Sequence, residues 1–393
     1  MVGYRRRVLF SIGLLSILFL PAFVKMTLSQ TSFAAGLFLS LCFLLVLLPK
    51  VRHRTYSIKT IIIVMAILVT VFMHAILVFV LFPGFDIFRF ISSLLFMMFC
   101  IFVALHFSYF IQNQPSNNID KVVQYLIWFF VLNALIGLLK FNLYPAWDLE
   151  KPVGLFSEPS HFVLSLTPVL IYACAARFSG YLVYLIFFLI WGFVIESLVA
   201  IVLVMLCFFM ILSFKKMLLV FSSLALFVYF AVDVNYFVQR ILLSPESNNL
   251  SVIVFLMGWD MAHEIMMATS LWGSGFQQFG VFEVDSQFVT TIAELGLEGQ
   301  NQFDGGSTAP KIIGEFGMLG LFIIMLYIYL FLKFFLEIKQ QRTGEKNKLL
   351  FQVFVIAFAL ELFVRGVGYF SPGAFLLLVG LMGLVRKSKK AIV

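Results

Sequence analysis

The chain alternates between long runs of apolar residues and short polar segments along almost its whole length. Bilayer hydrocarbon is about 30 Å thick, so a helix that spans it needs roughly 20 mainly apolar residues. The apolar runs therefore predict an all-α polytopic membrane protein with about twelve transmembrane helices in one bundle. The predicted spans are 8–24, 33–49, 60–82, 89–111, 121–140, 161–177, 181–195, 197–213, 217–234, 311–332, 349–364 and 371–385.

The least regular stretch lies between 181 and 213, where Glu196 and Ser197 interrupt an apolar run that forms either two helices or one long or re-entrant helix. Two connections, 141–160 and 235–310, are longer than the others, and both are rich in aromatic residues and poor in charge runs. Long connections on a rigid bundle usually carry function. We expect these two to form the mouth of an active site on a single integral membrane domain, residues 1–393.

The composition excludes a water-soluble enzyme. Hydrophobic residues make up 62% of the chain and charged residues 12%, whereas a soluble chain carries roughly 25% charged residues. The four cysteines all lie inside apolar runs, so neither a disulfide framework nor a Cys-x-x-Cys metal site is expected.

The distribution of charge predicts the orientation, because cytoplasmic segments of membrane proteins carry an excess of Lys and Arg. With the N-terminus and Arg5–Arg7 inside, 20 of the 27 basic residues and only three of the 19 acidic residues lie on that side. Both termini are then cytoplasmic and both long loops face outward. The net charge of +8 reports this orientation and gives no indication of nucleic acid. The stretch 8–24 lacks a cleavage site after it and is interpreted as an uncleaved anchor.

The first outward loop ends in Gly154-Leu-Phe-Ser-Glu-Pro-Ser-His161, directly before an apolar helix. Pro159 suits the first turn of a helix and a neighbouring serine can cap it, so one interpretation is only a helix start. That interpretation leaves Glu158 and His161 unexplained. A carboxylate and an imidazole at a helix N-terminus form a pair that can accept a proton, and both are candidate catalytic residues.

The second outward loop contains a predicted amphipathic helix over 254–267, which we expect to lie across the outer mouth of the bundle. Its polar face is either a solvated surface or a source of catalytic groups; His263, close to Trp259, is the candidate on this face. The apolar face comprises Val254, Gly258, Met261 and Ile265, and the polar face Asp260, His263 and Glu264.

A glycine-spaced segment, 271–280, follows this helix. It lacks the Gly-Lys-Ser/Thr ending of a nucleotide-binding loop and faces away from cytoplasmic nucleotides. Close approach of its backbone to a neighbouring helix or a ligand is the preferred interpretation. Asp304-Gly-Gly-Ser307 forms another tight turn, and Lys311, Gly314 and Glu315 then enter the next span.

Only seven basic residues lie on the outward side, where the topology rule disfavours them. For Lys25 and Arg89 we favour contact with lipid headgroups, since long basic side chains extend to the membrane surface. For the others near the long loops, an anionic ligand such as phosphate is the better explanation. These candidate pyrophosphate-binding residues are Lys151, Arg240, Lys311 and Arg365.

Few ionisable residues lie inside the predicted spans, notably His74, His106 and Glu361. Coupled transporters commonly carry several such groups along an ion or proton path. The spans therefore argue against a transporter, and His74 is interpreted as a packed, hydrogen-bonded histidine.

Together these features resemble the Wzy-type O-antigen polymerase and O-antigen ligase superfamily, which are bacterial inner-membrane glycosyltransferases. The topology is similar over most of the chain: about a dozen spans, cytoplasmic termini and one large periplasmic loop before the last spans. Three local segments carry the resemblance: Val153–His161 with its Glu-Pro-Ser, Trp259 with Leu271–Gly280, and Gly314–Gly320.

The resemblance implies a GT-C-like bundle in the inner membrane that transfers a glycan from undecaprenyl pyrophosphate to a sugar hydroxyl, without a metal or other cofactor. Arg240, Arg365, Lys311 and Lys151 are suited to bind the pyrophosphate. Either Glu158 or His263 is suited to act as the base, with His161 orienting. Trp147 and Trp259 are suited to stack on sugar rings.

The Glu-Pro-Ser segment favours a polymerase that joins repeat units on the lipid carrier. A ligase that moves finished polymer to lipid A core is the alternative from the same class. A flippase or other transporter of lipid-linked oligosaccharide is the alternative from a different class. The expected partners are undecaprenyl-pyrophosphate-linked glycans, membrane lipid and a chain-length regulator protein.

Overall fold

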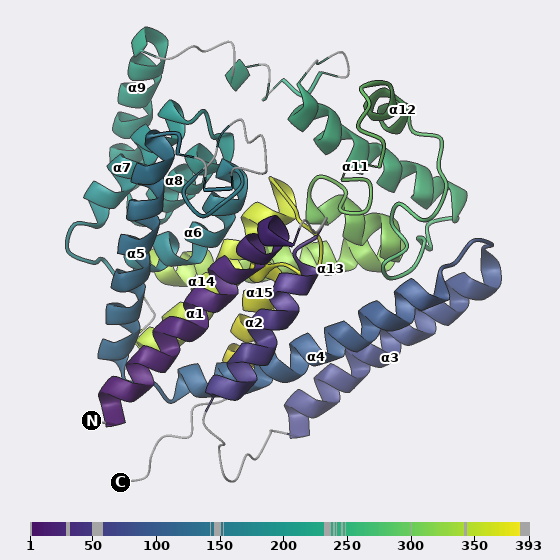
Figure 1. Ribbon diagram of the computed structural model, residues 1–393, viewed down its shortest axis with the longest axis horizontal. Helices are drawn as coiled ribbons and strands as arrows, with labels where there is room; N and C mark the ends of the chain where they lie inside the picture. The colour runs from purple at the N-terminus through teal and green to yellow at the C-terminus, as the bar shows by residue number, and fades with distance from the viewer. Residues whose placement is uncertain are drawn as a thin grey trace.

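The computed structural model is an all-α protein whose helices account for most of the residues it describes (Figure 1). Every apolar run predicted to span the membrane forms a helix. The structure describes residues 2–28, 32–48, 58–141, 143–144, 151, 153–231, 237–238, 240, 242–244, 247, 249–299, 301–341 and 344–385.

Fourteen helices lie in these described ranges. They are α1 (Val2–Thr27), α2 (Ala34–Leu47), α3 (Ile58–Leu81), α4 (Ile87–Gln112), α5 (Ser116–Leu138), α6 (Pro159–Ala175), α7 (Tyr181–Val194), α8 (Leu198–Ile211), α9 (Phe214–Ala231), α11 (Leu250–Ala268), α12 (Gln287–Glu294), α13 (Thr308–Lys339), α14 (Lys346–Phe363) and α15 (Pro372–Val385).

The prediction of twelve spans is wrong as a count of helices that can cross a membrane. By length and composition, six described helices meet that requirement, α1, α3, α4, α5, α11 and α13, and they mark the chain as a multi-pass membrane protein. Five other apolar helices have only 14 to 17 residues. At 1.5 Å per residue, 14 residues reach about 21 Å, which is less than the roughly 30 Å of hydrocarbon.

The apolar run around Glu196 forms two separate helices and not one long or re-entrant helix. Helix α7 ends at Val194 and α8 begins at Leu198, and the two pack against each other as a hairpin. Glu196 adopts a left-handed backbone conformation (φ 57°). The hydroxyl of Ser197 then caps α8 by accepting a hydrogen bond from the backbone N–H of Ala200.

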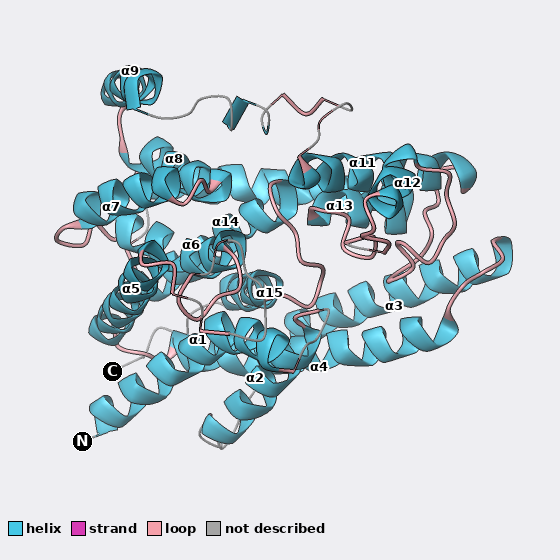
Figure 2. Ribbon diagram, turned by 45° about the horizontal axis from the view of Figure 1, so that its top comes forward, coloured by secondary structure: helices cyan, strands magenta, loops and turns pink. Residues whose placement is uncertain are grey.

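Two helices form the centre of the bundle. In α6 every residue from His161 to Cys174 is buried, and α14 is buried over nearly its whole length. The two pack on each other, and α1, α5, α8, α13 and α15 surround them (Figure 2). Helices that are apolar on all sides are buried ones, so the lack of amphipathic periodicity in both segments is explained by this central position.

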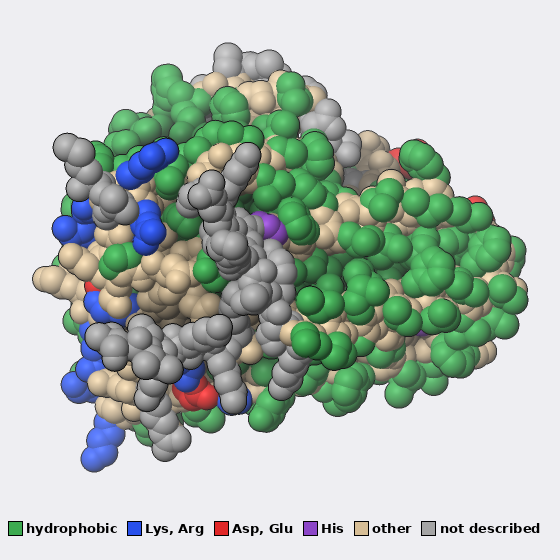
Figure 3. Space-filling view, turned by 90° about the horizontal axis from the view of Figure 1, so that it is seen from below, with side chains coloured by type: hydrophobic (Ala, Val, Ile, Leu, Met, Phe, Trp, Pro, Cys, Tyr) green, Lys and Arg blue, Asp and Glu red, His purple; other side chains and the backbone are tan. Residues whose placement is uncertain are grey.

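The two ends of the molecule differ in their surfaces. Helices α3 and α4 extend away from the bundle, and apolar side chains cover that part of the surface, whereas Lys and Arg gather at the end where α1 begins (Figure 3). On α3 several large apolar side chains are exposed, among them Ile62 (61%) and Met65 (54%). This apolar surface suits contact with lipid.

The long connection predicted at 235–310 includes two helices. It contains α11 and α12, and the predicted apolar face of α11 is confirmed, since Val254, Gly258, Met261 and Ile265 are all buried. Helix α11 is itself long and apolar enough to cross a membrane, which its interpretation as a surface helix did not anticipate. The first connection is described at 141, 143–144, 151 and 153–160, and within it Val153 and Phe156 form a single antiparallel bridge.

Candidate functional site

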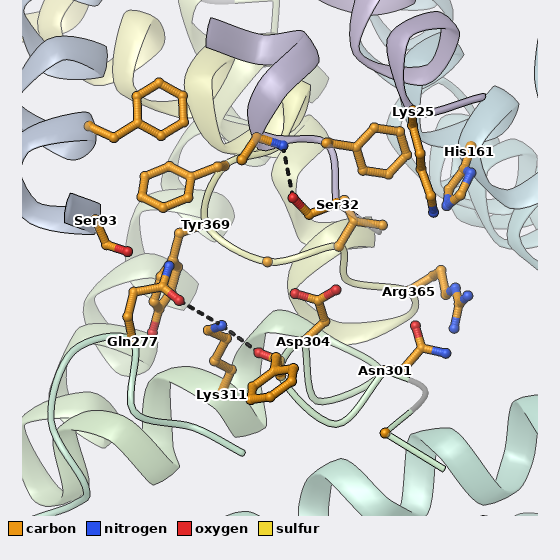
Figure 4. A pocket seen from close by; sticks show the side chains of 18 of the residues that line it. Lys25, Ser32, Ser93, His161, Gln277, Asn301, Asp304, Lys311, Arg365 and Tyr369 are labelled. Atoms are coloured by element: carbon orange, nitrogen blue, oxygen red, sulfur yellow. Dashed lines mark hydrogen bonds between the residues drawn. The ribbon is translucent and has the colours of Figure 1, made fainter. Parts of the chain in front are cut away.

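A cavity of about 1020 Å³ lies where the ends of several helices meet. Its walls come from the end of α1, the start of α2, one face of α4, the start of α6, the turn before α13 and the connection between α14 and α15 (Figure 4). Ligand pockets commonly measure about 300–1,000 Å³, so this one has room for a large ligand. Its charged and imidazole side chains are Lys25, Arg89, Glu158, His161, Glu298, Asp304, Lys311 and Arg365.

Glu158 is the centre of a polar cluster at the start of α6. It is the N-cap residue, in extended conformation, and Pro159 fills the first position of the helix as predicted. One oxygen, Oε1, accepts a hydrogen bond from the Ser160 hydroxyl (2.6 Å) and lies 2.8 Å from Nε2 of His161. A guanidinium nitrogen of Arg365 lies 3.6 Å from the same oxygen. The structure therefore brings together three of the residues that the sequence singled out.

The environment of Glu158 keeps its carboxylate ionised. Burial alone raises the pKa, but the hydrogen bonds with His161 and Ser160 and the charge of Arg365 together hold the pKa of Glu158 well below its usual range. A carboxylate with such a low pKa is a weak base. We therefore interpret Glu158 as a fixed negative charge that orients His161 and Arg365.

The imidazole of His161 is buried and contacts Ser157, Glu158 and Phe33. Its side chain is 6% exposed, its Nδ1 lies 3.1 Å from the Ser157 hydroxyl, and the Phe33 ring meets the imidazole edge-on at 4.7 Å. The ammonium of Lys25 lies 5.0 Å from the centre of the same Phe33 ring. Lys25 thus reaches this cluster from the end of α1 (Figure 4).

Lys25 and Arg89 were expected to contact lipid headgroups, but both line the cavity. Arg89 stacks on the Phe303 ring at 4.2 Å. Like Arg365, both are basic residues on the predicted outward side, so the sequence could have identified them in the same way. On α4 the cavity-lining residues occupy one helical face, namely Arg89, Ser92, Ser93 and Phe96.

Lys311 lies in a second cluster, at the start of α13. Its side chain is almost completely buried, and the ammonium donates hydrogen bonds to Oε1 of Gln277 (3.3 Å) and to the Phe303 carbonyl (2.5 Å). The carboxylate of Glu315 lies 3.8 Å away and the Tyr369 ring 5.1 Å away. The buried carboxylate of Glu315 thus balances the charge of Lys311. The neutral oxygens of Gln277 and Phe303 also hold the ammonium in place.

The glycine-spaced segment 271–280 packs against a break in α13, which confirms the predicted close approach of its backbone to a neighbouring helix. At Gly317 the chain leaves helical geometry (φ 56°, ψ −130°). The segment then satisfies backbone groups at the break, as a broken membrane helix requires. The bonds run from Ser274 N to Gly314 O (2.9 Å), from Gly275 N to Glu315 O (2.8 Å) and from Met318 N to Leu271 O (3.0 Å).

The structure does not bring the candidates on α11 to the cavity. His263 is 68% exposed and lies 3.3 Å from the neighbouring Glu264, and Trp259 is 37% exposed. Asp260 accepts a hydrogen bond from the Ser286 hydroxyl at 2.6 Å. The polar face of α11 therefore fits the interpretation of a surface that serves packing and solvation.

The remaining candidates also lie elsewhere. Lys151 is paired with Glu196 at 2.5 Å, which ties the first outward connection to the α7–α8 turn. Arg240 is half-buried and does not line the cavity. Trp147 lies outside the described residues.

Replacement of Lys151 by alanine is expected to change the activity of the protein by less than about two-fold. The side chains of Lys151 and Glu196 are 37% and 42% exposed, and ion pairs of that exposure contribute only about 0–1 kcal/mol to stability. The measurement is the activity of the variant beside that of Arg365→Ala, which removes a cavity cation and should lose most activity. Equal losses in both variants would place Lys151 in the site.

Comparison of the chain with protein-family models, with curated proteins and with solved structures gave no match in any of the three. The resemblance noted from local segments therefore remains a prediction. Within the described ranges, no three His, Cys, Asp or Glu side chains are grouped so that they could hold a metal ion.

Proposed function

We propose that this protein is a glycosyltransferase that polymerises undecaprenyl-pyrophosphate-linked oligosaccharide repeat units at the outer face of a bacterial inner membrane. The observation that carries the proposal is the convergence of basic side chains. Four of the seven basic residues on the predicted outward side, Lys25, Arg89, Lys311 and Arg365, line one cavity, although they come from different parts of the chain.

The chemistry of such a transfer suits this cavity. The leaving group is a lipid pyrophosphate, on which negative charge develops as the bond to the sugar breaks. Fixed positive charges in a partly enclosed site stabilise that charge more strongly than water does. Arg365 and Lys25, close to Glu158 and His161, are the groups placed to do so.

Helix α4 supports a lipid-linked substrate in particular. Its cavity face begins with the polar Arg89, Ser92 and Ser93 and continues one turn further with Phe96, whose ring lies 4.5 Å from that of Phe370. The opposite face is apolar and exposed, with Ile91 50% and Met98 45% accessible. Helix α4 therefore presents polar side chains to the cavity and apolar side chains to the surface. This arrangement suits a ligand with an anionic head and an apolar tail.

Deletion of the gene, followed by analysis of the surface polysaccharide, tests this function. Loss of a polymerase should leave the lipid A core capped with a single repeat unit. Polymer stranded on the undecaprenyl carrier would instead identify a ligase. Unchanged chain lengths in both pools would overturn the assignment as a glycosyltransferase of this pathway.

A further inference from the structure

Another carboxylate of the cavity, that of Asp304, lies in its middle and points into the open space between the two clusters (Figure 4). Asp304 belongs to the turn that leads into α13. Its backbone N–H and that of Gly305 both donate to the Asn301 carbonyl, at 3.1 and 3.0 Å. These bonds hold the turn in one conformation.

Glycines make this turn possible and fix its place. Gly305 and Gly306 both have positive φ (67° and 66°), which favours glycine. The carbonyl of Gly305 packs so closely on Gly258 of α11 that a side chain there would come within 1.9 Å of it. Gly306 accepts a hydrogen bond from the N–H of Gly366, in the connection that carries Arg365. The turn is thus built into the wall of the cavity.

The carboxylate of Asp304 differs from that of Glu158 in its surroundings. Among the described residues, no hydrogen-bond donor or cation lies within bonding distance of it, whereas Glu158 already has three partners. Gly368 leaves room for the carboxylate of Asp304, since a Cβ at position 368 would lie 2.7 Å from Oδ1 of Asp304. Lys25 lies within electrostatic range. The lone pairs of Asp304 are therefore available to a ligand.

We propose that Asp304 is the catalytic base, which binds the acceptor sugar hydroxyl and takes its proton. This inference rests on the proposed function and names the acceptor side of the same site. A carboxylate with free lone pairs suits both tasks, because it accepts hydrogen bonds from sugar hydroxyls and removes a proton as the hydroxyl attacks. Neither Glu158, whose carboxylate is paired with His161 and Arg365, nor His263, which is outside the cavity, is placed to do this.

The proposed transfer forms one glycosidic bond and breaks one bond to pyrophosphate. The acceptor oxygen forms a bond to the anomeric carbon of the donor glycan, and its proton passes to Asp304. The bond between the anomeric carbon and the pyrophosphate oxygen breaks, and its electron pair leaves with undecaprenyl pyrophosphate, beside the basic side chains. Asp304 then releases the proton to water.

The test uses the full chain in lipid nanodiscs and lipid-linked oligosaccharide extracted from cells that lack the gene. Asp304→Asn is expected to lower the transfer rate by about 100-fold or more, since general-base catalysis contributes typically 10²–10⁴-fold. Asp304→Glu should recover part of the rate. Binding of undecaprenyl pyrophosphate, measured by native mass spectrometry, should change by less than about two-fold in both variants, because the donor side of the cavity is untouched.

Asp285→Asn is the matched control, because Asp285 is an exposed aspartate that does not line the cavity. It should transfer at the wild-type rate. A wild-type rate in Asp304→Asn, with an active wild-type protein, would overturn the role of Asp304 and leave the proposed function standing. A wild-type protein that transfers no glycan from the extract would overturn both. Loss of undecaprenyl pyrophosphate binding in Asp304→Asn would assign Asp304 to the donor side and overturn its role as base.

Discussion

Replacement of Glu158 by glutamine is expected to reduce glycan transfer by about 100-fold or more, because it releases His161 and Arg365, and a donor positioned at a developing charge contributes on the order of 10²–10³-fold. Glutamine keeps the shape of the side chain but removes the charge that His161 and Arg365 face at 2.8 and 3.6 Å. Both groups then lose the partner that orients them. Surface polymer from a strain that carries this variant, together with the amount of inserted protein, is the measurement.

Glu196→Gln provides the control for Glu158→Gln. Glu196 is also a carboxylate paired with a basic residue, Lys151, but it lies outside the cavity. The control should give wild-type chain lengths. If Glu158→Gln gives them as well, while inserting normally, Glu158 has no part in the reaction.

Replacement of Gly317 by alanine is expected to destabilise the protein by about 3 kcal/mol, through strain in a backbone conformation that only glycine adopts readily. The added methyl group would also come within 1.9 Å of the Leu271 carbonyl. That contact would push segment 271–280 off the break in α13. Because Gln277 of this segment holds Lys311 in place, glycan transfer should fall together with stability.

Thermal unfolding in detergent, followed beside Gly344→Ala, measures the effect of Gly317→Ala. Gly344 has no atom within 4 Å of an added Cβ, and its φ is not in the positive range. The control should unfold at the wild-type temperature. An unchanged unfolding temperature in Gly317→Ala would show that the close packing at the break contributes little.

The sequence predicted the helices well and their membrane role less well. All twelve apolar runs form helices, because backbone groups in an apolar environment must bond within the segment. The error concerned length: α2, α7, α8 and α15 have only 14 residues each. An apolar run indicates that a segment is removed from water. The length of the helix that it forms in the structure indicates whether lipid or other helices surround it.

The candidate site was predicted in part. Glu158 and His161 lie three residues apart at the start of a helix, so local geometry alone brings them together. Arg365 and Lys311 were identified because basic residues are disfavoured on the outward side. That rule uses only the position of a residue along the chain, so it cannot show which of the seven outward basic residues share a cavity. Arg240 and Lys151 were therefore included as phosphate-binding candidates, and Lys25 and Arg89 were left out. Asp304 was assigned only to a turn, because an acidic residue beside two glycines has no local signature of catalysis.

The sequence by itself therefore determined the class of the protein, the positions of its helices and the Glu158–His161 pair, since these follow from hydrophobicity and from contacts a few residues apart. Only the tertiary structure decided which distant side chains share a cavity. It placed Lys25, Arg89 and Arg365 around the same space and left the carboxylate of Asp304 open within it. The physical reason is that these neighbours come from the ends of different helices, whose meeting depends on how the whole bundle packs.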